Sequence, residues 1–271
     1  MADEPTVTYQ AQDKVSTITL NRPRALNAIN RSMKTEFLEA FDRAEADPEV
    51  SVVVLRGAGR SFCAGVDLKQ AATDPWDHSV AGWRWHLTGC LAMCLRMWTL
   101  TKPVIAAVRG HALGSGCDLA LSADLTVAAS DATFGEPEIR GTSGPPGLMM
   151  PWVVGLKRAK ELLLFGDSVD AAEAERLGIA NRVFPVDSFD AEVDRYAARL
   201  SRIPAAALAL NKRTINKTFE MMGLRNALDF NTEVMISTNM SKPAEQRAAR
   251  QKQIAEGGLK AMLEKRDDGL V

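Results

Sequence analysis

The stretch that decides the fold is Val104-Ile-Ala-Ala-Val-Arg-Gly-His-Ala-Leu-Gly-Ser-Gly-Cys-Asp118. Its first five residues form a continuous apolar run, which is typical of a strand covered on both faces. A glycine-containing loop follows, and the residues from Ser115 to Ser122 then predict a short helix. The stretch therefore predicts a buried strand whose end leads through a glycine loop into a helix.

The same order occurs upstream, where residues 50–56 are a β-branched run followed by the loop Ser61-Phe-Cys-Ala-Gly-Val-Asp-Leu-Lys69. A helix with Ser32 as N-cap is expected to precede this strand and to end at Asp47-Pro48. The remaining expected elements are strands over residues 6–10, 14–20, 124–129 and 132–134, and helices over residues 78–100, 205–222, 224–240 and 244–265.

Strand, loop and helix alternate without a fixed sequence period, so the expected fold class is α/β with a core of stacked right-handed turns. Strands stop near residue 201, and only helices are expected beyond it. The sequence thus predicts a core over residues 1–200 and a C-terminal helical region over residues 201–271. The charged helix faces of that region fit either solvent or a contact between subunits.

Composition excludes several classes of protein. The chain has 271 residues, 46% of them hydrophobic, with 33 basic and 34 acidic side chains and a net charge of −1. A chain of this length and composition can bury a large core. No global positive field would attract nucleic acid or an anionic membrane. We expect neither as a partner, and we expect a soluble, cytoplasmic protein because no apolar signal core or membrane span is present.

Cysteines and histidines give no sign of a disulfide framework or a metal site. The four cysteines are too few for such a framework in a chain this long, and Cys90 and Cys94 have the spacing of one helix face. Buried, reduced thiols are the favoured interpretation. The three histidines show no metal-ligand spacing with the cysteines, so no metal is predicted.

The two glycine loops are candidates for binding an anion. Free N–H groups at the start of a helix favour negative charge, and loops at the ends of parallel strands often bind ligands. The spacing of Gly114 and Gly116 is neither a dinucleotide fingerprint nor a phosphate loop. The structural alternative is an ordinary surface turn in which Gly57, Gly59 and Gly65 only reverse the chain.

Two carboxylates follow the glycine loops. Asp118 lies in the first turn of the predicted short helix, and Glu138 follows the next pair of strands. Together they could converge on one water molecule, as general acid–base addition across a double bond requires. Separately, Asp118 could simply compensate the helix dipole, and Glu136 and Glu138 could be solvated loop charges.

These residues resemble the crotonase, or enoyl-CoA hydratase/isomerase, superfamily. The resemblance covers most of the chain and rests on segments that occur in the family's order. They are Asn21-Arg-Pro-Arg-Ala-Leu-Asn27, Ser61 to Lys69, Lys102-Pro-Val-Ile-Ala-Ala-Val108, Ala112-Leu-Gly-Ser-Gly-Cys-Asp-Leu119, Ala132-Thr-Phe-Gly-Glu-Pro-Glu138 and Ala171-Ala-Glu-Ala-Glu-Arg-Leu-Gly-Ile-Ala-Asn-Arg-Val183.

The resemblance implies a spiral of β-β-α turns, with C-terminal helices that build homotrimers or homohexamers. It implies an acyl-CoA substrate and no separate cofactor, since coenzyme A is part of that substrate. By similarity, the N–H groups of Val66 and Ser115 would form an oxyanion hole, and Asp118 and Glu138 would be the catalytic carboxylates. The residues expected to contact coenzyme A, besides Val66 and Ser115, are Arg24, Ala25, Leu26, Ala64, Asp67, Leu68 and Lys69.

Three departures from the family's common pattern concern the acyl group and the reaction. Asp118 stands where glutamate is usual, Ser115 replaces a glycine, and the segment from Arg140 to Pro151 has gained two prolines and two methionines. Trp76, Trp83, Trp85 and Trp98 are expected to pack in the core or at interfaces, although a place along the acyl pocket would favour an aromatic or cyclic acyl group.

Three functions remain open at this stage. A hydratase acting on a 2-enoyl-CoA is the leading hypothesis because two carboxylates are present, and a double-bond isomerase would need only one. A catalytically weak family member that binds acyl-CoA, a protein or an RNA is the third possibility.

Overall fold

The computed structural model describes residues 4–73, 79–141 and 144–267. Its main sheet has the order β1-β2-β3-β4-β6-β9, in which only the β1–β2 pair is antiparallel. The strands are β1 (Val7–Gln12), β2 (Val15–Leu20), β3 (Val52–Gly57), β4 (Val104–Val108), β6 (Leu125–Ala129) and β9 (Arg182–Phe184). The expected α/β class is confirmed.

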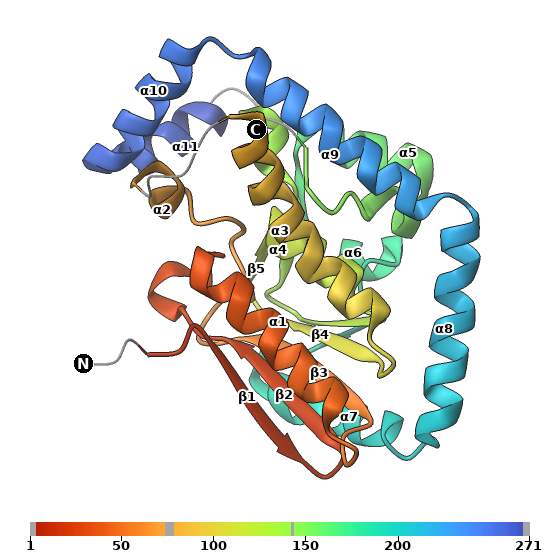
Figure 1. Cartoon of the computed structure of the whole chain (residues 1–271). Coiled ribbons are helices and arrows are strands. Elements are labelled where there is room, and N and C mark those ends of the chain that lie inside the picture. The colour runs from red at the N-terminus through yellow and green to blue at the C-terminus, as the bar shows by residue number, and fades with distance from the viewer. Residues whose placement is uncertain (1–3, 74–78, 142–143, 268–271) are drawn as a thin grey trace.

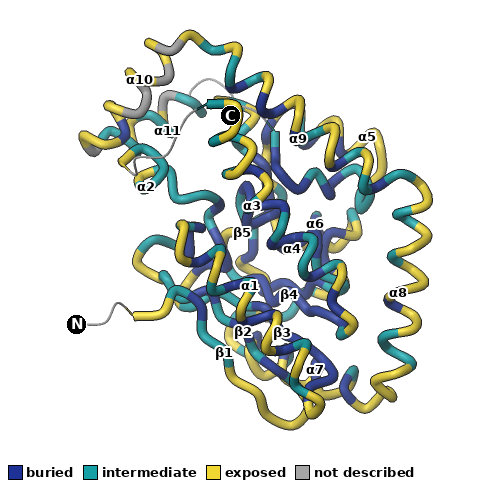
Figure 2. Tube along the Cα trace, in the orientation of Figure 1, coloured by how far each residue is buried: buried dark blue, intermediate teal, exposed yellow. Residues whose placement is uncertain are grey.

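Alternate residues of the central strands β3 and β4 pack into two different hydrophobic layers. Val53, Leu55 and Ala106 face the main core, where the helices α1 (Arg31–Ala46) and α3 (Val80–Thr99) pack. Val54 and Ile105 face a smaller core against α7 (Phe189–Leu200). Helices therefore cover both faces of the sheet. Because both faces are buried, the residues of β3 and β4 that face either layer are apolar. Figure 2 shows these strands buried.

A second, small sheet was not predicted as such. It has the order β5-β7-β8, made of β5 (His111–Leu113), β7 (Thr133–Gly135) and β8 (Ser168–Asp170). Residues 111–113, which we expected in a loop, form β5 and pair in parallel with β7. A three-residue strand is too short to leave a periodic signal in the sequence. It matters because β5 leads directly into α4 (Ser115–Ser122), whose predicted bounds are confirmed.

Two local predictions near the N-terminus are wrong. The N-cap of α1 is Asn30, whose side chain accepts the N–H of Met33, and not Ser32. Asparagine caps helices as well as serine does, so either residue could have served. The first hairpin turns at Asp13 and Lys14, both with positive φ, so β1 runs two residues further than expected.

The remaining helices connect and cover the sheets (Figure 1). They are α2 (Leu68–Thr73), α5 (Met150–Phe165), α6 (Ala171–Leu177), α8 (Ala205–Met221), α9 (Leu224–Ser241), α10 (Ala244–Gln253) and α11 (Leu259–Asp267), with short 3-10 turns at Pro23–Ala25, Pro137–Arg140 and Val186–Ser188. The helix predicted from residue 78 begins at Val80 after the N-cap Ser79; residue 78 itself lies outside the described residues. No described helix is long and apolar enough to cross a membrane.

The C-terminal region is helical, as expected, but its last predicted helix is divided. A π-helical turn at Ile254–Gly258 separates α10 from α11, and Figure 1 shows both folding back beside α2. Helix α8 stands apart and is exposed along most of its length (Figure 2). Its buried Lys212 attaches it to the core, because Nζ lies 2.7 Å from a carboxylate oxygen of Asp124.

Candidate active site

The two glycine loops meet at the start of α4. Gly65 has φ of +89°, and a Cβ atom built there would lie 2.9 Å from the carbonyl oxygen of Leu113 and 3.5 Å from the nitrogen of Ser115. Only glycine allows the first loop this conformation and this close approach. The residue after Gly65, Val66, is therefore held beside the first residue of α4.

The backbone hydrogen bonds of these loops and of α4 do not use the N–H groups of the two expected donors. The N–H of Ile29 donates to the carbonyl of Gly65, and the N–H of Asp67 donates to the carbonyl of Ile29. Because successive N–H groups in an extended segment point to opposite sides, the N–H of Val66 faces away from this pairing. Ser115 is the first residue of α4, so its N–H has no acceptor within the helix.

Both donor residues line a cavity of about 440 Å³. Its wall combines the glycine loops, the 3-10 turn at Pro137–Arg140, and side chains from α2, α3, α9 and α11. The lining residues are mostly apolar, with a few polar groups among them, as is typical of small-molecule sites. The polar side chains are those of His86, His111, Ser115, Glu138, Asn239 and Arg266.

Glu138 is the carboxylate in this wall. Its side chain packs on Gly114, where any Cβ atom would collide with the carboxylate, so this glycine is required by the contact. Burial raises the pKa of Glu138 to about 7, although backbone N–H donors, including that of Ser115, and the Arg266 guanidinium act in the opposite direction. At neutral pH Glu138 can therefore both give and take a proton.

Asp118 lies one layer deeper. It is 1% exposed, and its Oδ2 accepts the N–H of Gly147 at 2.7 Å. Burial raises the pKa of Asp118 to about 8, the Gly147 N–H lowers it, and the nearby Glu138 raises it. Its Oδ1 has no hydrogen-bond partner among the described residues. Thus Asp118 and Glu138 are brought together, but Glu138 lines the cavity while Asp118 backs its wall.

Glu136 is not a solvated loop charge, which was one interpretation of this segment. Its side chain is 2% exposed and lies against Cys117 of α4. Burial, followed by the charges of Asp118 and Glu138, raises its pKa well above the ordinary value for a glutamate. Burial therefore favours the protonated form of Glu136 in the folded protein.

Besides Val66 and Ser115, three of the residues expected to contact coenzyme A line the cavity. Leu26, Ala64 and Leu68 line it, and the N–H of Ala64 donates to the carbonyl of Leu26. Asp67 does not point freely into the site, because it forms an ion pair with Arg22. The other expected residues are Arg24 and Ala25 in the first 3-10 turn and Lys69 in α2, with both Arg24 and Lys69 exposed.

Residues from the distant helices were missed by the sequence reasoning. Arg266 and Leu263 come from α11, Asn239 and Met235 from α9, and His86 from α3. No local motif marks them, because only tertiary packing brings these helices to the cavity. The unusual segment after Arg140 contributes Gly144 and Pro146 to the wall, whereas Met149 and Met150 lie in the core.

The tryptophans divide between packing and the cavity. Trp83 lines the main cavity, whereas Trp98 donates a hydrogen bond to Glu220 and packs edge-on against Phe219. Trp76 lies outside the described residues. Trp85 is half exposed and lines a second, small cavity of about 30 Å³.

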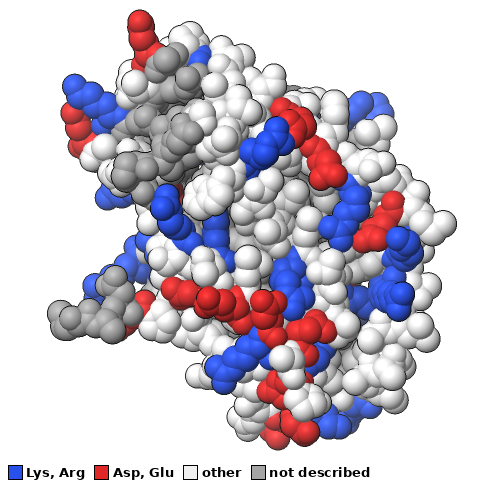
Figure 3. All heavy atoms as spheres, in the orientation of Figure 1, with Lys and Arg blue, Asp and Glu red and all other residues white. Residues whose placement is uncertain are grey.

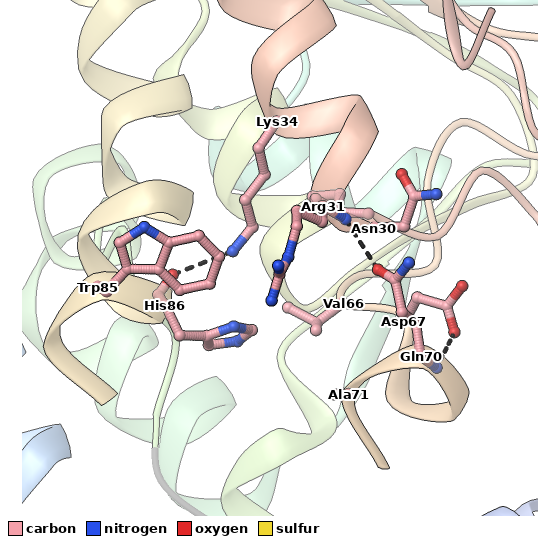
Figure 4. Close-up of a pocket in the computed structure, with 10 residues that line it drawn as sticks. Asn30, Arg31, Lys34, Val66, Asp67, Gln70, Ala71, Trp85 and His86 are labelled. Carbon is pink, nitrogen blue, oxygen red and sulfur yellow. Dashed lines mark hydrogen bonds between the residues drawn. The ribbon is translucent and has the colours of Figure 1, made fainter. Parts of the chain in front are cut away.

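Figure 4 shows this second cavity between α1, α3 and the segment from Val66 to Ala71. Arg31 and Lys34 of α1 lie within 5.1 and 5.7 Å of the Trp85 ring centre, and Lys34 donates to the carbonyl of His86. Because Val66, Ala71 and His86 line both cavities, the small one adjoins the wall of the large one. Its volume is that of about one water molecule.

The face of the molecule drawn in Figure 3 carries both basic and acidic side chains, in keeping with the net charge of −1. Across the described residues, no three histidine, cysteine or acidic side chains are arranged to hold a metal ion. All four cysteines are buried and unpaired, as predicted.

Known proteins resemble this chain over nearly its whole length. The sequence model of the enoyl-CoA hydratase/isomerase family matches residues 10–269. A protein named probable enoyl-CoA hydratase from Mycobacterium bovis is 36% identical over 220 residues, which are 79% of this chain and 82% of that protein. The short-chain-enoyl-CoA hydratase of Clostridium acetobutylicum is 34% identical, covering 84% of this chain and 87% of that one.

The solved structures agree with the sequence match. The crystal structure of an enoyl-CoA hydratase/isomerase from Xanthobacter autotrophicus superimposes with a TM-score of 0.90 and 38% identity, covering 97% of both chains. Together with the paired glycine loops and the carboxylates behind them, these matches show that the chain belongs to the enoyl-CoA hydratase/isomerase family, the crotonase superfamily.

Proposed function

We propose that this protein is an enoyl-CoA hydratase, which adds water to the double bond of a 2-enoyl-CoA thioester. The observation that carries the proposal is that Val66, Ser115 and Glu138 line one cavity. Relatives at 34–36% identity are named as enoyl-CoA hydratases, which supports the same reaction.

In the proposed mechanism the thioester oxygen lies between the N–H groups of Val66 and Ser115. Water adds to C3, and the negative charge that develops on the thioester oxygen is stabilised by these donors. Each such donor typically lowers a barrier by ~2.7–4 kcal/mol, so the pair supplies a large part of the catalysis. No side chain is needed for that stabilisation.

Glu138 then moves the protons. Its raised pKa, about 7, suits a group that takes a proton from water and returns one to C2 near neutral pH. We propose that Asp118 orients the water through its Oδ1, while Gly147 holds its other oxygen. Its shorter side chain would place this oxygen about one carbon–carbon bond, ~1.5 Å, further back than a glutamate would.

Coenzyme A is proposed to lie along Arg24, Ala25, Leu26, Ala64, Asp67, Leu68 and Lys69, and no separate cofactor is needed for the reaction. Leu26, Ala64 and Leu68 support this path because they border the cavity next to Val66. The exposed basic side chains of Arg24 and Lys69 suit the phosphates of the nucleotide end.

We also propose that residues 201–271 form the oligomer contacts of a homotrimer or homohexamer, with residues 1–200 as the core. Helices α8 and α9 of this region, and α5 of the core, expose large apolar side chains that a monomer would leave in water. Those more than 60% exposed are Leu156, Leu164, Phe165, Leu210, Met221, Met222 and Phe230.

One observation favours a double-bond isomerase as the second candidate. Only Glu138 of the two carboxylates lines the cavity, and proton shuttling between C2 and C4 needs a single carboxylate. The two candidates differ in their need for Asp118.

The deciding experiment follows the ultraviolet absorbance of the conjugated thioester with a series of 2-enoyl-CoAs and 3-enoyl-CoAs. Hydration removes the absorbance of a 2-enoyl-CoA, whereas isomerisation of a 3-enoyl-CoA creates it. If acyl-CoA binds but neither substrate is converted, the proposal fails and a catalytically weak binding protein is the better description.

A further inference from the structure

Arg266 of α11 lines the cavity, and the mechanism above does not use it. It is the one permanent cation among the described residues that line the cavity, and 18% of its side chain is exposed. It is also near enough to Glu138 to lower the pKa of that carboxyl. A C-terminal helix therefore contributes a positive charge to the cavity wall.

One ion pair within α11 orients Arg266, and a second joins α11 to the turn that carries Glu138. The Nε and Nη2 atoms of Arg266 both donate to Asp267, each at 2.8 Å, which is a fork-like pairing of fixed geometry. Asp267 in turn accepts Nη1 of Arg140 at 3.4 Å. Arg140 ends the 3-10 turn that carries Glu138, so α11 and this turn are joined through Asp267.

Arg140 is a firm anchor for this connection. Its side chain is 10% exposed, its Nε donates to the carbonyl of Phe165 at 2.8 Å, and its Nη2 pairs with Asp167. Because a planar guanidinium bound on several edges loses little freedom on binding one more carboxylate, Asp267 meets a preorganised partner.

The other groups that face Glu138 cannot supply the same charge. Asp118 and Cys117 of α4 and Glu136 of the preceding segment are acids, and each favours a protonated Glu138 when it ionises. The remaining titratable side chains in the cavity wall are His86 of α3 and His111 of β5, and the ring of His111 is within 2.8 Å of the Thr133 hydroxyl.

We propose that Arg266 is a positioning residue, delivered by α11 and held through Asp267 and Arg140, whose positive charge keeps Glu138 available as a carboxylate base. The inference rests on the proposed function for its role in turnover, but the effect of the Arg266 charge on Glu138 can be tested without it. Its consequence is that α11 is part of the active site as well as of the C-terminal region.

The test compares Arg266→Gln with Arg266→Lys and with Lys260→Gln. Lys260 lies on the same helix, is 90% exposed and pairs with Glu264, so it is a matched surface control. In Arg266→Gln, the acid limb of the pH profile of kcat/KM, which reports ionisation of Glu138, is expected to move to higher pH by roughly one unit. Arg266→Lys keeps the positive charge, so its acid limb should lie close to that of the wild type. Lys260→Gln should leave the profile unchanged.

A second readout separates this inference from the proposed function. The side-chain carboxyl carbon of Glu138, followed by NMR during a pH titration of the free protein, should show the same upward shift in Arg266→Gln. An unchanged Glu138 titration in a folded Arg266→Gln variant would overturn the inference. Failure of the wild-type protein to convert any enoyl-CoA would overturn the hydratase proposal, while the NMR titration would still decide the role of Arg266.

Discussion

The wall of the cavity and the layer behind it both contain acidic side chains, but the pKa values of those side chains have different causes. The wall presents Val66, Ser115 and Glu138, with N–H donors and a carboxyl whose pKa is near 7. The layer behind holds Asp118, Glu136 and Cys117, all buried and with raised pKa values. The difference is that the Arg266 guanidinium lowers the pKa of Glu138, whereas burial and neighbouring acids raise the pKa values in the layer behind.

This difference predicts separate consequences of substitution. Changes in the wall should alter turnover, because its groups are those we propose to contact the reacting atoms. Changes in the layer behind should alter the orientation of the attacking water and the pH dependence of stability, because ionisation of a buried acid carries a desolvation cost. Four substitutions test that division.

The largest effect is expected for Glu138→Gln. Removing the proton carrier should reduce conversion of a 2-enoyl-CoA by roughly 10²–10⁴-fold, measured as the initial loss of conjugated absorbance. Glu264→Gln, an exposed glutamate on α11, is the control and should retain full activity. If Glu138→Gln kept more than about a tenth of the rate, Glu138 would not be the proton carrier.

Ser115→Pro is expected to have the next largest effect. Proline is tolerated at the first position of a helix but has no N–H, so the change removes one oxyanion donor while α4 can still form. The turnover number should fall by about 10²–10³-fold. Ser115→Gly keeps the N–H and should stay near the wild-type rate; equal losses in both variants would assign the effect to the hydroxyl instead.

Asp118→Asn tests the layer behind the wall. If Asp118 orients the water, hydration should fall by roughly 10–100-fold, since misplacement by about an ångström costs on the order of 10². Binding of a saturated acyl-CoA, measured by calorimetry, should not change. A loss as large as that of Glu138→Gln would break the distinction between the two layers, and full retention would favour the isomerase.

Glu136→Gln should have the smallest effect, on stability alone. The folded state raises the pKa of Glu136, so this group's stabilisation is fully present below the unfolded pKa near 4.3 and is lost as pH rises toward the folded pKa. Glutamine cannot ionise and resembles the protonated acid. The stability of the variant relative to wild type should therefore increase as the pH is raised from about 5 to about 8.5, by ~1.4 kcal/mol for each pKa unit that separates the unfolded and folded states.

Urea unfolding at the two pH values measures that gain. The control is Glu264→Gln, whose exposed side chain should leave the pH dependence unchanged. A parallel pH dependence in Glu136→Gln and wild type would mean that Glu136 is not held protonated in the folded protein.

Much of the fold could be predicted from local patterns. The buried strand at Val104–Val108, the helix Ser115–Ser122 and the helical C-terminal region were all recognisable, because apolar runs and periodicities are local properties of a chain. The strand His111–Leu113 and the break at Ile254–Gly258 were not, since they depend on pairing and packing with distant segments.

The candidate site also contains residues that local motifs located and features that no local motif marks. Motifs in sequence order located Val66, Ser115, Asp118 and Glu138, and their roles remain predictions for the experiments above. No local pattern predicts that Glu136 is buried. Its neighbours in sequence, Gly135 and Pro137, occur equally in exposed turns.

The sequence by itself determined the α/β class, the family and the two glycine loops, because each depends on residue types at short spacing. Only the tertiary structure decided which carboxylate lines the cavity and that Arg266, far along the chain, stands beside Glu138. The physical reason is that burial and charge at a point depend on every segment packed there, and α3, α9 and α11 reach this point only in the folded chain.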